Sequence, residues 1–316
     1  MIEAYILVSA IILDFLFGDP YSIPHPIVYV GKLISYIQKK IRRSNIDLKT
    51  GGFILVFTVL TTVFLSISVI LLISKAISPI LNVIVTIYLL YTSLAAKCLK
   101  DEGMKIYRVL KESDIKKARL LISYLVGRDT ERLSENEITR ATVETIAENT
   151  IDGVLAPLFY MFIGFLVGMP VQFVFLYKSI NTLDSMVGYT NKKYKDIGYA
   201  SAKLDDLVNF IPARIGAIFM ILSGFKYDIK NGFKILLRDR LNHKSPNAGY
   251  PESAVAGLLN IQIGGENTYF GEKIYKPTIG DKNRPLENED IKKTTNIMYM
   301  SEILFALVIS FILLKY

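Results

Sequence analysis

Residues 53–73 read FILVFTVLTTVFLSISVILLI and contain no charged side chain. A helix of about 20 apolar residues crosses the ~30 Å hydrocarbon core of a bilayer, so this run predicts a membrane-spanning helix. Residues 76–96 are also uncharged, and Lys75, Ser78 and Pro79 lie where two antiparallel helices would turn. The two runs together predict a helical hairpin in a membrane.

Three further apolar segments flank this hairpin. Residues 4–17 are apolar except for Asp14, and they predict a span near 2–17. A cleaved signal peptide is not expected, because no basic region precedes the run and no small-residue cleavage site follows it. Residues 299–314 predict a final membrane anchor. Residues 154–177 are uncharged but contain two prolines and two glycines, so they predict either a kinked span or a re-entrant hairpin.

The composition supports a polytopic membrane protein. The chain has 316 residues, of which 51% are hydrophobic, and its mean hydropathy is +0.36, which is too apolar for an ordinary soluble domain. We expect an all-α integral membrane protein with one domain, 1–316. Its polar regions 18–52, 97–153 and 178–298 would form cytoplasmic or interfacial helices, with a Gly- and Pro-rich loop within 242–285.

The formal charge of +8 is distributed unevenly. Residues 21–52 contain six basic residues against the single acid Asp47: Lys32, Lys39, Lys40, Arg42, Arg43 and Lys49. The positive-inside rule places this region in the cytoplasm of a cell-membrane protein, which explains the basic excess without nucleic acid. One cysteine, Cys98, and two histidines, His25 and His243, argue against disulfides, zinc or iron–sulfur sites and a Ser/His/Asp triad.

Three polar clusters lie beside apolar segments. The first has a spacing of four residues with Asn149 adjacent, and comprises Arg140, Glu144, Glu148 and Asp152. The second comprises Lys178, Asn181, Asp184 and Ser185, and the third comprises Lys203, Asp205, Asp206 and Asn209, followed by Arg214. Such spacings line one helix face. Grouped carboxylates favour Mg²⁺, which binds carboxylate, phosphate and water oxygens. The alternative is a solvated helix end in which Arg140 pairs with Glu144.

Two other regions contain candidate site residues. Asp14, Asp19 and His25 surround a Gly-Asp-Pro turn near the N-terminus, and an unpaired Asp14 in a membrane helix is costly. The later loop contains His243, Ser245, Asn247 and Glu252, followed by Gly264 and Gly265. Backbone amides at glycines can approach phosphate groups. No Walker A motif occurs, so any use of ATP requires another binding mode.

Several motifs resemble one known family along nearly the whole chain. They are Gly-Asp-Pro at 18–20 with His-Pro at 25–26, Glu-Thr-Ile-Ala-Glu-Asn at 144–149 with Asp-Gly at 152–153, Asn-Thr-Leu-Asp-Ser-Met at 181–186, and Ser-Pro-Asn-Ala-Gly at 245–249 with Pro-Glu at 251–252. In order and spacing they resemble the adenosylcobinamide-phosphate synthase family (CobD/CbiB).

The resemblance implies an ATP- and magnesium-dependent amide ligase of cobalamin biosynthesis. Such an enzyme joins adenosylcobyric acid to (R)-1-aminopropan-2-ol O-phosphate, or to the free or a related amino alcohol, and gives adenosylcobinamide phosphate. Glu144, Glu148, Asp152 and Asp184 would organise magnesium and phosphate, with Asp205 and Asp206 as alternates. Lys178, Lys203 and Arg214 would neutralise phosphate charge. The general base would be His25, His243 or Glu252.

Two other functions are also compatible with the sequence. A magnesium-dependent membrane prenyl or phosphoalcohol transferase also uses acidic clusters beside an apolar cavity. A transporter uses broken apolar helices with polar midpoints, although no internal repeat is visible here. The expected partners are a corrinoid, the amino alcohol phosphate and the lipid bilayer. A homo-oligomer, or association with other corrinoid-pathway enzymes, is also open.

Overall fold

The computed structural model describes residues 1–20, 25–189, 191–269 and 271–315. The chain forms two compact units that alternate along the sequence. The first unit contains Met1–Ala95, Pro157–Asn209 and Ala306–Tyr316. The second unit contains Ala96–Ala156 and Phe210–Phe305. Each unit therefore combines segments that are distant in sequence.

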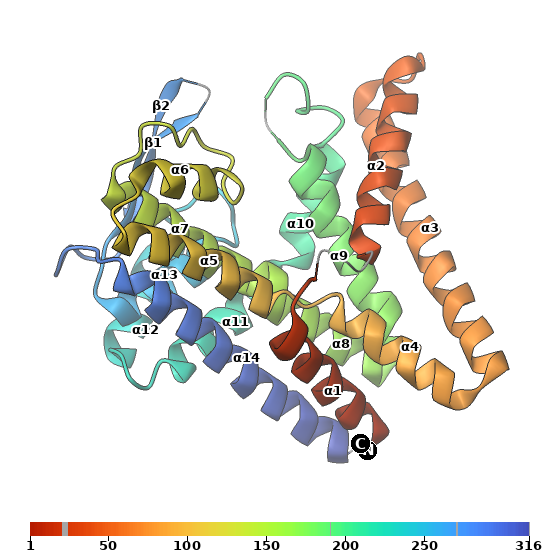
Figure 1. The fold of residues 1–316 in the computed structure, drawn as a ribbon. Helices are drawn as coiled ribbons and strands as arrows, with labels where there is room; N and C mark the ends of the chain where they lie inside the picture. The colour runs from red at the N-terminus through yellow and green to blue at the C-terminus, as the bar shows by residue number, and fades with distance from the viewer. Residues whose placement is uncertain (21–24, 190, 270, 316) are drawn as a thin grey trace. The chain divides into compact units, whose positions relative to one another are not determined.

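The first unit is helical, and α3 is its longest helix (Figure 1). Its elements are α1 (Ile2–Phe17), α2 (Pro26–Arg43), α3 (Leu48–Ile77), α4 (Pro79–Tyr91), most of α8 (Ala156–Leu166), α9 (Pro170–Val187), α10 (Tyr199–Val208) and the end of α14 (Glu289–Lys315). Helix α3 packs against α2, α4, α9 and α10, and α1 packs against α4.

The predicted hairpin turns at Ser78. The Ser78 side chain caps α4 by accepting a hydrogen bond from the Ile80 amide at 3.2 Å. The Asn82 side chain donates to the Leu71 carbonyl and to the Ser74 hydroxyl, each at 3.0 Å, across the turn. Since few polar groups are available in an apolar hairpin, these bonds fix where the chain reverses.

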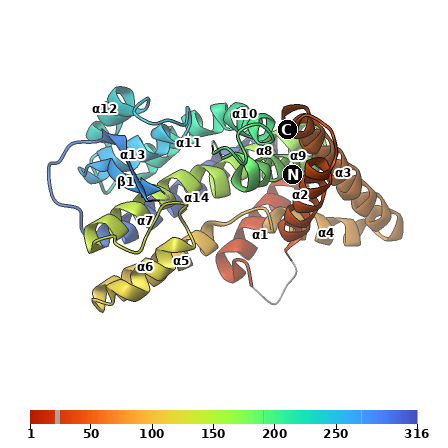
Figure 2. The ribbon, with the colours of Figure 1, turned by 90° about the horizontal axis from the view of Figure 1, so that it is seen from above.

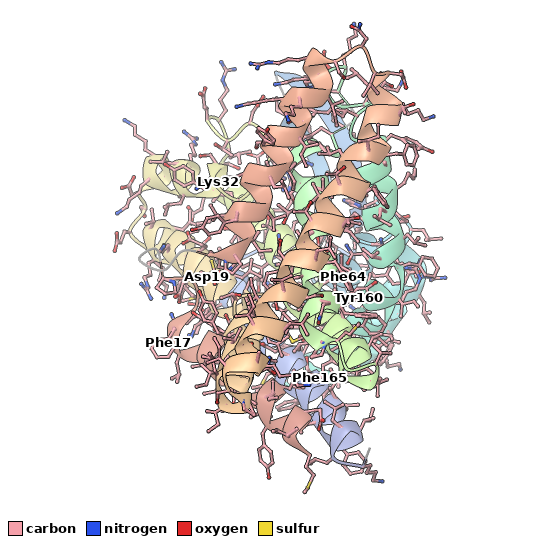
Figure 3. All side chains as sticks on the ribbon, turned by 90° about the vertical axis from the view of Figure 1, so that its right-hand side faces the viewer. Phe17, Asp19, Lys32, Phe64, Tyr160 and Phe165 are labelled. Atoms are coloured by element: carbon pink, nitrogen blue, oxygen red, sulfur yellow. The ribbon has the colours of Figure 1, made fainter. Side chains whose placement is uncertain are left out.

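Residues 26–43, predicted only as part of a polar region, form the amphipathic helix α2. Its apolar residues Val30, Ile34 and Ile41 are buried, and its last turn is basic. An apolar cavity of about 340 Å³ lies in the first unit between α2, α3 and α9. Figure 3 shows this side of the unit, with Lys32 labelled on α2; its ammonium group lies 5.3 Å from the centre of the Tyr29 ring. The arrangement suits a helix lying at a membrane surface.

The uncharged run 154–177 contains a reversal of the chain. Helix α8 ends at Leu166, the Met169 amide donates to the Gly164 carbonyl at 2.7 Å, and α9 begins at Pro170. The rings of Tyr160 and Tyr177 stack with centroids 4.9 Å apart. Gly164 permits the tight turn, because a Cβ there would lie 2.5 Å from the Pro170 Cα. A single straight span through 154–177 is thereby excluded.

The second unit is built around a buried helix, α13 (Figure 2). Its elements are α5 (Ala96–Lys111), α6 (Ile115–Ser123), α7 (Glu135–Thr150), the π-helical turn η1 (Ile151–Leu155), α11 (Phe210–Ser223), α12 (Ile229–Asp239), α13 (Gly249–Leu259), β1 (Ile263–Tyr269), β2 (Glu272–Ile279) and the start of α14. Helix α13 is buried along nearly its whole length, and it packs against α7, α11, α12 and β2.

The region 242–285 differs from the loop that the sequence predicts. It contains α13 and an antiparallel hairpin in which β1 pairs with β2, with an irregular register between Ile263 and Gly265. Gly264 and Gly265 both have positive φ, 82° and 88°, a conformation that favours glycine. The glycines that obscured the strand pattern are therefore what allow the bulge in β1.

Four helical segments in the described part of the chain are long and apolar enough to cross a membrane. They are Leu48–Ile77, Pro79–Lys111, Glu135–Leu166 and Glu289–Lys315, and α10 with α11 would add a fifth if counted together. The prediction of an all-α polytopic membrane protein is confirmed. Residues 135–153, part of the predicted polar region 97–153, continue into α8 as one helical segment, Glu135–Leu166.

Candidate active site

Glu144 is the centre of a buried polar group in the second unit. Its carboxylate is 2.5 Å from the guanidinium of Arg128, and the Gly264 amide donates to its other oxygen at 2.9 Å. Arg128 also donates to the Asn267 side chain, which is buried on β1. The group therefore combines Glu144 of α7, Arg128 of the 124–134 connection, and Gly264 and Asn267 of the hairpin. We call Arg128, Arg140, Glu144, Glu252 and Asn267 the Glu144 cluster.

Arg140 lies one turn before Glu144 on α7. Its Nε atom is 3.8 Å from the nearer oxygen of Glu144, and its Nη2 atom donates to the Glu266 carbonyl at 2.7 Å. The predicted pairing of Arg140 with Glu144 is thus present, but it is not an exposed helix end, since both side chains are largely buried. Two arginines consequently share one carboxylate, which leaves positive charge for a further anion.

Glu252 lies on the buried helix α13, close enough to Glu144 and Glu148 to feel their charges. Burial raises the pKa of Glu252 well above the usual carboxyl range, and the neighbouring carboxylates raise it further. Its nearer oxygen is 4.0 Å from the Nε2 atom of His243. A buried carboxyl group with a raised pKa is a typical candidate for proton transfer in an active site.

His243 is held in one orientation by the start of the Ser-Pro-Asn-Ala-Gly motif. Its Nδ1 atom accepts a hydrogen bond from the Ser245 amide at 3.0 Å, so the ring proton of the neutral form is on Nε2, facing Glu252. Burial lowers the pKa of His243 to about 4, and the charge of Lys276 acts in the same direction. The imidazole is therefore neutral at pH 7 and is a weak base.

The rest of this motif forms the entry to α13. The Ser245 hydroxyl accepts from the amides of Asn247 and Ala248, both at 3.3 Å. Gly249 is required by close packing, because a Cβ there would lie 2.3 Å from the Arg240 carbonyl. Arg214 donates to the Asn247 side chain at 3.2 Å, and its guanidinium stacks on nearby aromatic rings. The structure thus brings the predicted Arg214, Ser245 and Asn247 together.

In the first unit, the second and third predicted clusters meet at Asp205. Asn181 on α9 and Asn209 after α10 direct their side-chain amides to its two oxygens, at 3.4 and 3.1 Å. The Tyr177 hydroxyl donates to the Asn209 side chain at 3.0 Å, and Tyr160 donates to the Val208 carbonyl at 2.8 Å. We call these five residues, Tyr160, Tyr177, Asn181, Asp205 and Asn209, the Asp205 cluster.

Other predicted residues of this unit have local contacts. The Ser185 hydroxyl donates to the Asn181 carbonyl at 2.9 Å. Lys203 is 3.4 Å from Asp206, and the lysine is largely exposed. Lys178 and Asp184 both lie on α9, and Asp184 occupies the space where a side chain at Gly188 would be. None of these contacts by itself assigns a role in chemistry.

The N-terminal residues surround the start of α2. His25 caps this helix, its Nδ1 accepting from the Ile27 amide at 3.2 Å, and its Nε2 is 3.5 Å from an oxygen of Asp19. Asp14 is fully buried in α1, and the Tyr91 hydroxyl donates to the Gly18 carbonyl nearby. These bonds give His25 a structural role as a helix cap.

The regular helix that carries Glu144 ends soon after Glu148. Asn149 donates to the Thr145 carbonyl at 2.9 Å within α7, and Asp152 lies in the π-helical turn η1. Such turns in α-helices often occur at functional sites. The predicted four-residue stripe therefore holds for Arg140, Glu144 and Glu148 within α7, whereas Asp152 lies beyond its end.

The predicted magnesium ligands divide between the two units. Glu144, Glu148 and Asp152 belong to the second unit, and Asp184, Asp205 and Asp206 belong to the first. Among the described residues, no three acidic, histidine or cysteine side chains are grouped closely enough to hold one ion. The oxygen ligands present fit Mg²⁺ in kind, but substrate phosphate and water would have to complete its coordination.

The sequence did not point to Arg128 or Lys276. Arg128 lies in a polar connection with no periodicity, and only its burial at 8% exposure distinguishes it from the many surface arginines. Lys276 lies on β2, a strand hidden among Gly, Pro and Lys residues. Arg128 contacts Glu144, which is 16 residues away in sequence, and the charge of Lys276 acts on Glu252. Motif spacing reveals neither interaction.

Comparisons with known proteins identify one family across nearly the whole chain. The family model for the CobD/Cbib protein matches residues 7–298. Relatives named Cobalamin biosynthesis protein CobD are 49% identical in Clostridium tetani and 48% identical in Listeria monocytogenes, each across 98% of both chains. A relative with the same name in Citrobacter koseri is 41% identical across 93% of this chain and 92% of its own. No solved structure matches this chain. Because the similarity extends over nearly the whole sequence, the chain belongs to the CobD/CbiB family of cobalamin biosynthesis proteins.

Proposed function

We propose that this chain is an adenosylcobinamide-phosphate synthase. It joins a propionate carboxylate of adenosylcobyric acid to the amine of (R)-1-aminopropan-2-ol O-phosphate, with ATP as co-substrate. The observation that carries this proposal is the buried carboxyl pair of Glu144 and Glu252, each in a motif shared with the family, set between arginines and a neutral histidine. Such a group combines proton transfer with binding of anions.

The chemistry requires activation of the acid, because a carboxylate is a poor electrophile and hydroxide is a poor leaving group. In the proposed reaction a carboxylate oxygen attacks the γ-phosphorus of ATP, and ADP leaves. The amine then attacks the carbonyl of this acyl phosphate, the C–O bond to phosphate breaks, and one proton passes from nitrogen to a base. The products are the amide, ADP and phosphate.

Glu252 is our choice for the base. An ammonium group must lose a proton before it attacks, and a base works best when its pKa is near the working pH. Burial raises the pKa of Glu252 toward that range, whereas burial lowers that of His243 to about 4. His243 is then a positioning residue whose neutral Nε2–H faces Glu252. His25, the third predicted base, is used as a helix cap.

Arg128 and Arg140 are proposed to neutralise charge on phosphate and on the developing oxyanion, since guanidinium groups bind such oxygens well. Lys178, Lys203 and Arg214 stay as predicted alternatives. Magnesium, bound through Glu148 or Asp152 in the second unit or through Asp205 and Asp206 in the first, would supply further positive charge at the phosphates of ATP. The large corrinoid would lie on an apolar surface.

We also propose that the protein lies in the cytoplasmic membrane with its site facing the cytoplasm. The basic last turn of α2 supports this orientation through the positive-inside rule. Labelling of a cysteine at Lys282 by a membrane-impermeant maleimide tests it, in a Cys98→Ser background. The proposal expects labelling in inside-out vesicles but not in intact cells, and the reverse pattern would contradict it.

The activity itself is tested with purified protein in detergent. Adenosylcobyric acid, aminopropanol phosphate, ATP and Mg²⁺ are incubated together, and corrinoid mass and released phosphate are followed in parallel. We expect one amide formed for each ATP hydrolysed, and no amide without ATP. Free aminopropanol in a parallel reaction shows whether the phosphorylated form is the substrate.

Failure of folded protein to form amide with either amine would overturn the proposal. Transfer from a diphosphate substrate without ATP consumption would then favour a membrane prenyl or phosphoalcohol transferase. Substrate flux into proteoliposomes would instead favour a transporter.

A further inference from the structure

A polar cavity of about 440 Å³ lies in the second unit beside the N-terminus of α7. Its lining includes three cationic side chains, Arg140, Lys282 and Arg284, against one carboxylate, Glu137. The cavity is therefore positively charged, as a site for a small anion would be.

Two of the three cations are fixed before any ligand arrives. Arg284 donates two hydrogen bonds to the buried carboxylate of Asp290, at 2.8 and 2.6 Å. Arg140 is held by the Glu266 carbonyl at 2.7 Å. Lys282 is exposed, and within the described residues it forms no ion pair with a carboxylate. Asp290 balances the charge of Arg284, and Arg140 lies 3.8 Å from Glu144. The two arginines are therefore preorganised, and Lys282 supplies the charge that remains for a ligand.

The single carboxylate of the cavity is already used by the helix. Glu137 accepts hydrogen bonds from the Ser134 amide at 2.8 Å and from the Ser134 hydroxyl at 2.7 Å, as part of a capping box. These bonds hold its carboxylate at the start of α7, and its negative charge opposes an anion in the cavity. The partial positive charge of the helix N-terminus acts in favour of the anion.

Arg140 connects this cavity to the Glu144 cluster. It lines the cavity, and its Nε atom is 3.8 Å from Glu144. Arg140 therefore belongs both to the lining of the cavity and to the surroundings of the buried Glu144 carboxylate. A molecule with a phosphate at one end and an ammonium group at the other has charges complementary to the cationic cavity and to the Glu144 carboxylate.

We propose that this cavity binds the phosphate group of the amino alcohol phosphate, so that its ammonium group faces Glu144 and Glu252. Lys282 and Arg140 contact the phosphate, and the orientation presents the amine to the carboxyl group that removes its proton. This inference rests on the proposed function. The phosphates of ATP have the same chemistry, and the experiment separates the two sources.

The test uses the full-length protein in detergent and four variants. Lys282→Ala and Lys282→Glu weaken the cavity, Lys282→Arg retains its charge, and Lys116→Ala removes an exposed lysine of α6 in the same unit as a matched control. Two quantities are measured: equilibrium binding of radiolabelled aminopropanol phosphate without ATP, and the KM values for aminopropanol phosphate and for ATP in the amidation assay.

We expect Lys282→Ala to weaken binding of aminopropanol phosphate and raise its KM by about three- to fivefold, as for one partly exposed charged contact. Lys282→Glu should cost about tenfold or more, because repulsion is added. Lys282→Arg and Lys116→Ala should stay within about twofold of the wild type, and the KM for ATP should not change.

Two results would overturn the inference. A rise only in the KM for ATP would assign the cavity to the nucleotide, and unchanged binding in Lys282→Glu would remove the cavity from the site. If the wild type forms no amide but binds aminopropanol phosphate through Lys282, the proposed function fails while the cavity assignment stands. If the wild type forms amide and Lys282 has no effect, only the cavity assignment fails.

Discussion

The two polar clusters of this protein neutralise a buried carboxylate in different ways. In the second unit, Glu144 is met by the guanidinium of Arg128 and by a backbone amide, with Arg140 close by. In the first unit, Asp205 accepts hydrogen bonds from two asparagine amides, and the described residues place no cation within ion-pair distance of it. One cluster is balanced by charge and the other by dipoles.

This difference separates two uses of a buried carboxylate. A charge-balanced cluster can exchange its partners with charged substrates, because arginine binds phosphate as well as carboxylate. A cluster balanced by amides holds its carboxylate in place but offers no positive charge to a substrate. We therefore propose that the chemistry takes place at the Glu144 cluster and that the Asp205 cluster serves first to hold α9 and α10 together.

The largest effect is expected for Glu144→Gln. The substitution leaves Arg128 buried without its countercharge, which typically costs about 3–5 kcal/mol of stability, and we expect amidation to fall about 100-fold or more. Thermal unfolding in detergent and initial rates measure the two effects. The double variant Glu144→Gln with Arg128→Gln should regain stability but not activity. Full activity in Glu144→Gln would remove this cluster from the chemistry.

Glu252→Gln should separate activity from stability. Because burial raises the pKa of Glu252, the folded state favours the protonated form, and stability falls as pH rises from about 4.5 toward the folded-state pKa. The glutamine variant lacks this penalty, so it should unfold at a higher temperature than the wild type at pH 8 and at a similar one near pH 4. Turnover should fall about 100-fold. A destabilised variant at pH 8 would contradict the assignment.

His243 gives the opposite pH dependence. Its pKa is lowered to about 4, so the unfolded state binds the extra proton first, and stability should be lost as pH falls from 6.5 to about 4. His243→Gln should reduce this acid sensitivity and leave stability at pH 8 less affected. Unfolding temperatures across this pH range are the measurement, and an unchanged acid sensitivity would show that the histidine is not buried as described.

Asp205→Asn should have a smaller effect than Glu144→Gln. The new NH₂ group faces an amide donor, so one hydrogen bond is lost, at a cost of about 1–2 kcal/mol, but no buried cation is left without a partner. The two variants are compared in the same thermal and kinetic assays. If Asp205→Asn lowers turnover more than Glu144→Gln does, the Asp205 cluster, with its predicted magnesium ligands, would be the better candidate for the chemistry.

The smallest effect is expected for Tyr160→Phe. The phenylalanine keeps the stacking on Tyr177 and loses only the hydrogen bond to the Val208 carbonyl, so stability should fall by about 1 kcal/mol and turnover by less than twofold. The same assays apply. A large loss of activity with normal stability would mean that the Asp205 cluster contacts a substrate.

The sequence predicted the parts of this protein that depend on local pattern. The uncharged run 53–73 and the turn at Ser78 and Pro79 both follow from residues close together, and each is present. The spacing of Arg140, Glu144 and Glu148 also predicted one helix face correctly. The hairpin β1–β2 was not predicted, because Gly264 and Gly265 interrupt the alternation of polar and apolar residues that identifies a strand.

The contacts of the site residues could not be predicted from the sequence. Which arginine meets Glu144, and which carboxyl lies beside His243, depend on contacts between α7, α13 and the hairpin. Residue type alone left His25, His243 and Glu252 as equal candidates for the base. Burial distinguishes them, and burial is set by the packing of α13 against several other helices.

The alternation of the two units along the chain has a consequence for synthesis. Ala306–Tyr316 belongs to the same unit as Met1–Ala95, so the first unit lacks one of its three segments until translation reaches the last helix. Until then, the helices synthesised earlier have part of their packing surface uncovered. Chaperones or neighbouring chains can bind this surface. Removal of residues 306–316 should therefore destabilise the first unit, which includes the helices synthesised earliest. A ribosome stalled before residue 306 should hold a chain that is inserted in the membrane but sensitive to protease.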